Sequence, residues 1–387
     1  MRVKKRVTLV TAASVAVGAI VAAAMVTSPL AEAQPAAFVG GTPTVVASTV
    51  PVSGPGTGDE NPYGVAVVGS SQGKLVKGNV LVSNFNNAAN QQGTGTTIMS
   101  VSPSGHASVF AQINAATLPG KCPGGVGLTT ALSILDGGWV VVGSLPTTGG
   151  DPATSKAGCL LVLNSKGKVV ETFSGNGING PWDMTAVNFG RFSELFVTNV
   201  LNGTVAAALK AGVVPSVTPG PTVHGGTVLR LLVTTPAQGY GVPRLLNTTE
   251  VGSGFGERTD PAALVIGPTG VGVGRNGTLY VADTIGNRIT AIPNALCRHG
   301  SDGTGYTVSA NGFLSGPLGV AIAPNGDILA ANSGNGDLVE VTPRGVQVAD
   351  PMVTQGGAGA LFGLAVAPHG SGVYFVDDSV NTLDFVR

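Results

Sequence analysis

Asparagine and aspartate side chains recur at one position of a repeated pattern, directly after a short apolar strand. In GTLYVADTIGNRI, residues 277–289, the apolar run ends at Asp283 and a polar loop follows. The same position is filled by Asn84, Asn199, Asn332 and Asp377, and more weakly by Ser144. Their oxygens are ligands of the kind that Ca²⁺ takes, but Asn and Asp also cap turns by bonding their own backbone. A series at one type of turn favours the structural role.

Asp183 breaks the repeat and is the stronger candidate for chemistry. It lies in GPWDMTAV, residues 180–187, where comparable segments have a glycine, at Gly64, Gly319 and Gly363. Trp182 stands beside it. Tyr63 occupies the corresponding segment of another repeat. We expect Tyr63, Trp182 and Asp183 to form a ligand-binding face. A metal, if one is held, would take its ligands from Asp183, Asn84, Asn199, Asp283, Asn332 and Asp377.

The elements that position these residues repeat at a length typical of propellers and solenoids. The intervals from Asn84 through Ser144, Asn199, Asp283 and Asn332 to Asp377 are 60, 55, 84, 49 and 45 residues. A Gly- or Pro-led apolar run precedes each position, and glycine turns such as Asn276-Gly277 and Asn325-Gly326 join the two. These runs are residues 61–68, 124–132, 180–187, 267–273, 316–323 and 361–367.

Each unit is predicted to be a meander of four short strands. Third and fourth runs are clearest in residues 160–173 and 337–350, each with a turn at a glycine. Strands such as Leu279–Ala282 are apolar on both faces, as expected for a blade packed between two others. Long amphipathic helical patterns are absent from the sequence. The prediction is therefore an all-β, six-bladed β-propeller of four-stranded antiparallel blades.

The two ends of the chain are expected to meet in the last blade. The final unit offers three strands, and the β-rich segment Pro43–Thr49 is predicted to supply the fourth and close the ring. The domain organisation is then an N-terminal segment, 34–60, and a propeller, 61–387. The long third interval predicts an insertion over about 205–226, as an extended hairpin or loop, and an irregular stretch over 250–260.

Residues 1–33 have the pattern of a secretory signal peptide. A basic start is followed by an apolar run, Val7–Val26, and by Ala31-Glu32-Ala33, which fits a cleavage site. An uncleaved membrane anchor is the alternative. The remaining chain has 16 basic and 19 acidic residues, a net charge of −3, with no basic cluster that would favour nucleic acid. We expect a secreted or periplasmic monomer with no further membrane segment.

The chain contains three cysteines. In an exported protein this number predicts one disulfide and one leftover thiol. Cys122 and Cys159 are the candidate pair, with Cys297 alone, although three unpaired cysteines are the alternative that spacing cannot exclude.

The segments GPLGVAIAPNGDILAAN, residues 316–332, and GTLYVADTIGNRI resemble the NHL-repeat family, and the resemblance extends over residues 61–387. It implies a six-bladed propeller in which an N-terminal strand completes the last blade. Propellers of this kind include binding modules, lyases, lactonases and extracellular proteins. The first three units depart from the motif, with Ser144 in place of the Asx residue in the second unit and long inserts after Asn84 and Ser144.

Two classes of function follow from these features. The first is an exported binding module for a protein, peptide or glycan at the loop face, without a cofactor. The alternative is a metal-dependent hydrolase or lactonase of the gluconolactonase-like class, for which Ca²⁺ is the candidate ion. A streptogramin-lyase-like enzyme is disfavoured. His106 and His369 are expected in turns on the far face, His224 in the insertion and His299 in an irregular link, and no His–Glu pair is closely spaced.

Overall fold

The structure is a computed structural model that describes residues 36–387, and these residues form one compact unit of six antiparallel sheets. The six-bladed β-propeller predicted from the repeat is confirmed. The predicted signal peptide lies outside the described residues. Within residues 36–387, no helix has the length and apolar character needed to cross a membrane.

Five blades follow one another along the chain. The first holds β2 (Glu60–Val67), β3 (Val80–Asn86), β4 (Thr97–Val101) and β5 (Ala107–Gln112). The second holds β6 (Leu128–Leu135), β7 (Trp139–Ser144), β8 (Cys159–Leu163) and β9 (Val169–Phe173). The third holds β10 (Pro181–Asn188), β11 (Phe192–Asn199), β12 (Val223–Thr234), β13 (Leu245–Asp260) and β14 (Leu264–Ile266). The fourth holds β15 (Pro268–Val273), β16 (Leu279–Asp283), β17 (Arg288–Ile292) and β18 (Tyr306–Ala310). The fifth holds β19 (Pro317–Ile322), β20 (Ile328–Asn332), β21 (Leu338–Val341) and β22 (Gln347–Ala349).

The sixth blade joins the two ends of the described chain. It holds β23 (Leu361–Val366), β24 (Val373–Asp377), β25 (Thr382–Val386) and, as its outer strand, β1 (Thr44–Ser48). β1 runs antiparallel to β25, with Thr44 opposite Phe385 and Ser48 opposite Thr382. The predicted closure by the N-terminal strand is confirmed. Just before β1, the N–H of Gly41 donates to the carbonyl of Arg387 at 2.7 Å.

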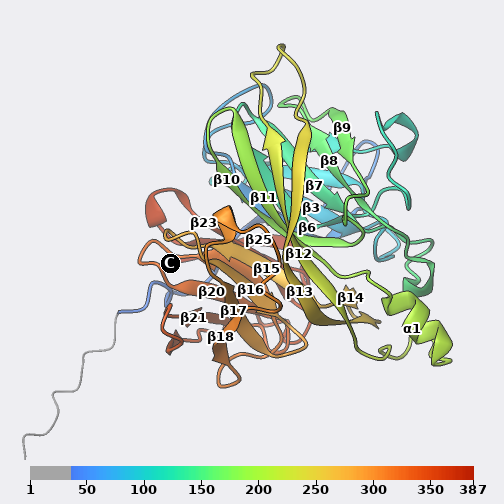
Figure 1. The fold of residues 1–387 in the computed structure, drawn as a ribbon. Helices are drawn as coiled ribbons and strands as arrows, with labels where there is room; N and C mark the ends of the chain where they lie inside the picture. The colour runs from blue at the N-terminus through green and yellow to red at the C-terminus, as the bar shows by residue number, and fades with distance from the viewer. Residues whose placement is uncertain (1–35) are drawn as a thin grey trace, which may run out of the picture. The chain divides into compact units, whose positions relative to one another are not determined.

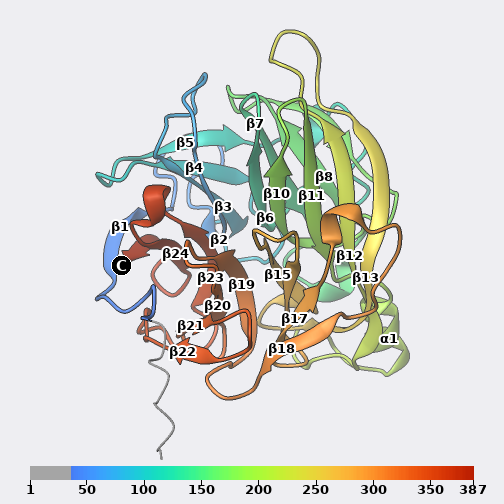
Figure 2. The same cartoon turned by 60° about the vertical axis from the view of Figure 1, so that its left-hand side comes forward.

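The first strand of each blade lies innermost. These six strands, β2, β6, β10, β15, β19 and β23, each contact the next in a closed circle (Figure 2). The second strands of all blades but the third are buried along their whole length, as in β16 and β20, because a neighbouring blade covers each face. The apolar residues on both faces of Leu279–Ala282 therefore pack in two inter-blade cores, one on each side.

The third blade differs from the sequence prediction. Residues 250–260, expected to be irregular, belong to the 16-residue strand β13, which pairs with β12 through several bulges. Gly252, Gly254 and Gly256 conceal this strand in the sequence because they contribute no side-chain pattern. The insertion is not only a loop, since Thr204–Lys210 forms the helix α1, whose alanines and leucine are good helix formers. Figure 1 shows α1 and the long β12–β13 turn at opposite ends of the blade.

The four remaining helical segments of residues 36–387 are single 3₁₀ turns in the connections. They are Ala115–Thr117, Pro152–Thr154, Ala295–Cys297 and Pro368–Gly370.

Two faces of the ring are distinguished by these strands. The Asx face carries the starts of the inner strands and the ends of the second strands, where Asn84, Ser144, Asn199, Asp283, Asn332 and Asp377 lie. The turn face carries the tight turns that join each inner strand to the second strand. Gly138, Gly190, Gly277, Gly326 and Gly370 take positive φ in five of those turns.

Candidate functional site

A cavity of about 310 Å³ occupies the centre of the ring. All six inner strands line it, mainly with residues from their second halves, such as Val67, Ile134 and Val273. Exposure increases along the inner strands: the first four residues of β10, β19 and β23 are buried and the later ones are partly exposed. The cavity therefore opens toward the turn face, whereas the sequence places the candidate binding site on the Asx face.

A β-bulge recurs in each inner strand, near the residues with which the lining of this cavity begins. The register with the second strand shifts after Pro62, Leu128, Pro181, Pro268, Pro317 and Leu361. Bulges of this type re-aim side chains and are common beside functional sites. Two residues after these positions, four blades have glycine, at Gly64, Gly270, Gly319 and Gly363.

Close approach of the inner strands explains the four glycines. A Cβ added at Gly363 would lie 2.0 Å from the carbonyl oxygen of Tyr63, and one at Gly319 would lie 2.1 Å from that of Phe362. The third blade has Asp183 at this level, and its side chain lines the central cavity. Asp183 stands out in the sequence because other blades have glycine at this position. The structure places its carboxyl group at the central channel.

The Asp183 side chain is largely buried. The residue is 8% exposed, and the N–H of Val271 in the next blade donates to its Oδ2 at 3.3 Å. Burial raises the pKa of Asp183 to about 7, while the N–H groups of Met184 and Val271 act in the opposite direction. No other ionisable side chain of residues 36–387 lines the cavity. Thr130 also lines it, and its Oγ1 is buried without a hydrogen-bond partner.

Four aromatic rings close the channel on the Asx side of Asp183. Tyr63 stacks on Phe85 at 4.6 Å and on Phe362 at 4.1 Å between ring centroids, and Trp182 lies 6.2 Å from Tyr63. Tyr63 and Trp182 are 2% and 3% exposed. The structure therefore corrects the expectation that these two residues line an open binding mouth with Asp183. Tyr63, Trp182, Phe85 and Phe362 together form an aromatic plug. Asp183 faces the cavity beyond it.

The β13–β14 hairpin, residues 258–266, covers this plug. Leu264 and Val265 pack in one core with Tyr63 and Trp182, and the indole Nε1 of Trp182 donates to the carbonyl of Val265 at 3.1 Å. At the hairpin turn, Gln92 of the first blade donates to the carbonyls of Pro261 and Ala262 at 3.1 and 3.3 Å. The hairpin thus spans from the third blade to the first across the centre of the Asx face.

Leu264 adopts a backbone conformation that bulky residues avoid. Its φ is +62°, and the N–H of Val265 donates to the carbonyl of Ala263 at 2.7 Å in a γ-turn. The side chain of Leu264 is fully buried. The strain is retained because burial of this side chain against the plug offsets it. Sequence reasoning missed this cover; its only signal was the excess length of the third interval.

Three of the Asx side chains link the second strand, by hydrogen bonds, to the segment that precedes the blade. Asn199 Oδ1 accepts from the N–H groups of Asn179 and Gly180 at 3.1 and 3.3 Å. Asn332 accepts from the N–H of Ser315 at 3.0 Å and donates to the carbonyl of Phe313 at 2.7 Å. Asn84 Nδ2 donates to the carbonyl of Thr49 at 2.9 Å and to Thr97 Oγ1 at 3.1 Å.

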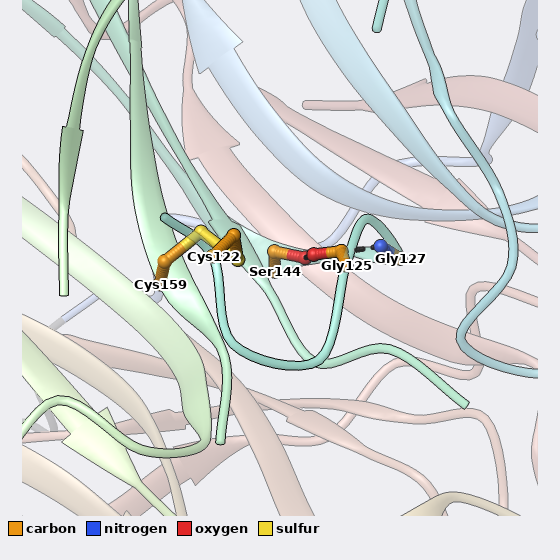
Figure 3. The surroundings of a disulfide bond; sticks show 5 residues. All are labelled: Cys122, Gly125, Gly127, Ser144 and Cys159. Atoms are coloured by element: carbon orange, nitrogen blue, oxygen red, sulfur yellow. Dashed lines mark hydrogen bonds between the residues drawn. A yellow bond between two sulfur atoms is a disulfide. The ribbon is translucent and has the colours of Figure 1, made fainter. Parts of the chain in front are cut away.

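The other three positions make comparable bonds. Asp283 Oδ2 accepts from Arg288 Nε at 2.7 Å, and Asp377 accepts from the hydroxyls of Thr354 and Ser379. Ser144 Oγ donates to the carbonyl of Gly125 at 3.0 Å and accepts from the N–H of Gly127 at 3.0 Å, as Figure 3 shows. All six side chains are thus engaged by the connections and turns of the Asx face.

The segment around Ser144 is also joined covalently. Cys122 and Cys159 form a disulfide with a Cα–Cα distance of 5.3 Å (Figure 3). It attaches the connection before β6 to the start of β8. Cys297 is free and exposed.

The donors around Asp183 do not fit Ca²⁺. This ion takes six to eight oxygen ligands, from carboxylates, carbonyls and waters. Asp183 supplies the single carboxylate of the cavity, and the five Asx candidates lie outside its lining. Within the described part of the chain, no three His, Cys, Asp or Glu side chains are grouped to hold a metal. The four histidines are also absent from the lining.

Fold and site together define a six-bladed β-propeller with a plugged Asx face and a central cavity toward the turn face. Solved structures share this fold. A putative gluconolactonase matches with a TM-score of 0.51 and 14% identity, over 90% of this chain and 92% of that one. The PQQ-bound aldose sugar dehydrogenase of Streptomyces coelicolor matches with a TM-score of 0.51 and 15% identity, over 90% and 98%.

A luciferin-regenerating enzyme also has a TM-score of 0.51, with 9% identity, over 90% of this chain and 95% of that one. At these identities the similarity establishes the fold alone. No protein-family model matches the chain, and no curated protein matches its sequence. The resemblance to NHL repeats stays a prediction.

Proposed function

We propose that this propeller acts on a small molecule held in the central cavity, and that Asp183 is the general base of the reaction. The observation that carries the proposal is the placement of one carboxyl group, in an otherwise uncharged cavity of about 310 Å³, at a position where four other blades have glycine. A cavity of this volume accommodates a compact ligand.

The reaction that we propose is hydrolysis of a lactone or small ester. With a pKa of about 7, Asp183 is partly ionised at neutral pH and can accept a proton there, as an effective general base must. The fold shared with a putative gluconolactonase supports this class of substrate. Because the donors do not fit Ca²⁺, the proposed reaction proceeds without this ion.

In the proposed step, Asp183 removes a proton from a water molecule as the water oxygen bonds to the acyl carbon. The bond between that carbon and the ring or ester oxygen then breaks. The proton passes from Asp183 to the departing oxygen, which leaves as a hydroxyl group, so that a lactone yields a hydroxy acid.

Binding of a protein, peptide or glycan at the Asx face is less well supported. The aromatic residues expected to contact such a ligand, Tyr63 and Trp182, are buried beneath the β13–β14 hairpin. Binding of a small molecule in the cavity without turnover is the second candidate, because a single carboxyl group in an otherwise uncharged cavity can also anchor a ligand. We further propose that the protein acts after export.

A panel of lactones and esters tests this proposal. Purified protein would be assayed with glucono-δ-lactone, δ-valerolactone and 4-nitrophenyl acetate, in the presence of a chelator, beside Asp183→Asn and Asp350→Asn. Asp350 is exposed and serves as the matched control. We expect turnover that Asp183→Asn lowers by ~100-fold or more and Asp350→Asn leaves unchanged. Saturable binding without turnover supports the second candidate. Activity that a chelator abolishes and Ca²⁺ restores contradicts the metal-free reaction.

A further inference from the structure

A second cavity, of about 380 Å³, lies on the Asx face between the β13–β14 hairpin and the fourth to sixth blades. The hairpin contributes Arg258, Asp260 and Ile266 to its walls. Ile285, Leu318 and Phe362 form the facing apolar wall. The Arg258 side chain is one third exposed, so its guanidinium group is accessible from solvent.

This second cavity is separate from the central one. The two share no lining residue, and Phe362, which lines the second cavity, belongs to the aromatic plug. The next residue, Gly363, lines the central cavity. A ligand in the second cavity would therefore be separated from Asp183 by the plug.

Arg258 is the distinctive polar residue of the second cavity because its hydrogen-bonding capacity is little used. Its Nη2 donates to Asp260 Oδ2 at 3.1 Å. Its Nε is buried without a partner, and Nη1 has no acceptor among residues 36–387. By contrast, Arg288 and Arg298 each donate three hydrogen bonds to protein acceptors. A guanidinium group has five N–H donors, so Arg258 retains donors for an external acceptor.

We propose that the second cavity binds a small monocarboxylate with an apolar body, whose carboxylate meets Arg258 and whose body contacts Ile266 and Ile285, which are half-buried. Planar guanidinium groups match carboxylates in geometry and charge. Asp260 is already occupied, by Arg258 and by the N–H of Ala262 at 3.0 Å. Its negative charge disfavours a phosphate dianion more than a singly charged carboxylate, and the apolar wall favours a ligand with a hydrocarbon portion.

Isothermal titration calorimetry with hexanoate and phenylacetate, beside hexanamide and phenylacetamide, tests this site. The amides have nearly the same shape without the charge. We expect the carboxylates to bind saturably and the amides to bind at least ten-fold more weakly. Arg258→Gln should weaken carboxylate binding at least ten-fold. Arg298→Gln is the matched control, since Arg298 pairs with Asp302 outside both cavities, and it should retain binding.

Two further variants separate this site from the central one. Ala358 is exposed and lines the second cavity, so Ala358→Trp should block binding without altering a buried core, and it decides the question if Arg258→Gln fails to fold. Asp183→Asn should leave carboxylate binding intact, whatever the outcome of the hydrolysis assay. The proposal is overturned if no probe binds, if amides bind equally, if Ala358→Trp has no effect, or if only Asp183→Asn abolishes binding.

Discussion

The indole Nε1 of Trp182 donates a hydrogen bond to the carbonyl oxygen of Val265 at 3.1 Å, and so joins the inner strand of the third blade to the hairpin that covers the Asx face. Asp183, the next residue, faces the central cavity on the other side of the aromatic plug. Two adjacent residues thus serve different functions: Trp182 closes one end of the channel, and Asp183 supplies the charge within it.

Replacement of Trp182 by phenylalanine should loosen the hairpin without opening a large cavity. The substitution retains an aromatic ring and removes the N–H donor, so the free energy of unfolding should fall by ~1 kcal/mol. Hydrogen exchange at the amides of residues 258–266 should become faster. Trp139→Phe is the matched control, because Trp139 Nε1 donates to the carbonyl of Pro236 at 2.7 Å, and it should alter exchange near Pro236 only. Unchanged exchange in the hairpin of Trp182→Phe would contradict this account.

Glu257 should make the protein less stable as the pH rises. It is fully buried on β13; its Oε1 accepts from the N–H of Asn202 at 2.8 Å, and its Oε2 has no partner. Burial raises its pKa from 4.5 to about 8. The folded protein therefore keeps a proton that the unfolded chain releases, and stability falls between about pH 4.5 and 8.

Glu257→Gln should remove this dependence. The variant should match the wild type near pH 4.5 and exceed its free energy of unfolding by up to ~3 kcal/mol at pH 7. Urea denaturation at several pH values measures the difference. A difference that does not vary with pH would show that Glu257 ionises in the folded protein as it does in the unfolded chain.

Loss of the disulfide should destabilise the protein. Cys122 and Cys159 are separated by 37 residues in the chain, and cross-links of this span contribute about 2–4 kcal/mol, chiefly by restricting the unfolded chain. Cys122→Ala/Cys159→Ala should lower the Tm to the same extent as a reducing agent lowers that of the wild type. Cys297→Ala, at the exposed free cysteine, should behave as the wild type under both conditions. An equal Tm with and without the disulfide would contradict the prediction.

Removal of β1 should destabilise the ring more than removal of the residues before it. A chain that lacks residues 36–48 loses the outer strand of the sixth blade, and its Tm should fall by at least ~5 °C. A chain that lacks only residues 36–41 keeps the pairing with β25 but loses the bonds from the Phe38 and Val39 N–H groups to Glu340. Differential scanning calorimetry of the two chains should show the smaller shift for the second. Equal shifts would mean that β1 contributes little.

The blades could be predicted from the sequence because their signals are local. The strand that ends at Asp283 and the glycine turn before it are both contained in a few consecutive residues. β13 could not be recognised, because its three glycines carry no alternation and because its pairing partner β12 begins within the predicted insertion. β13 forms a strand because it pairs with a segment distant in sequence, and local strand propensity does not reveal that pairing.

The site could be predicted only in part for a related reason. Asp183 was recognisable because it interrupts a glycine position. Burial of Tyr63 and Trp182 depends on Leu264 and Val265, which are distant in sequence and reach the plug through a strained turn that no motif signals. The side of the ring on which the cavity opens follows from this cover, and the order of the strands does not determine it.

The pH dependence of kcat/KM for lactone hydrolysis, measured in a chelator for the wild type and Asp183→Asn, tests the proposed function most directly. A general base acts when it is ionised, so wild-type kcat/KM should rise as the pH increases through about 7 and then level off. Asp183→Asn should lose both the rise and at least ~100-fold of the rate. Equal rates and equal pH profiles for the two proteins would contradict the assignment of Asp183 as the general base.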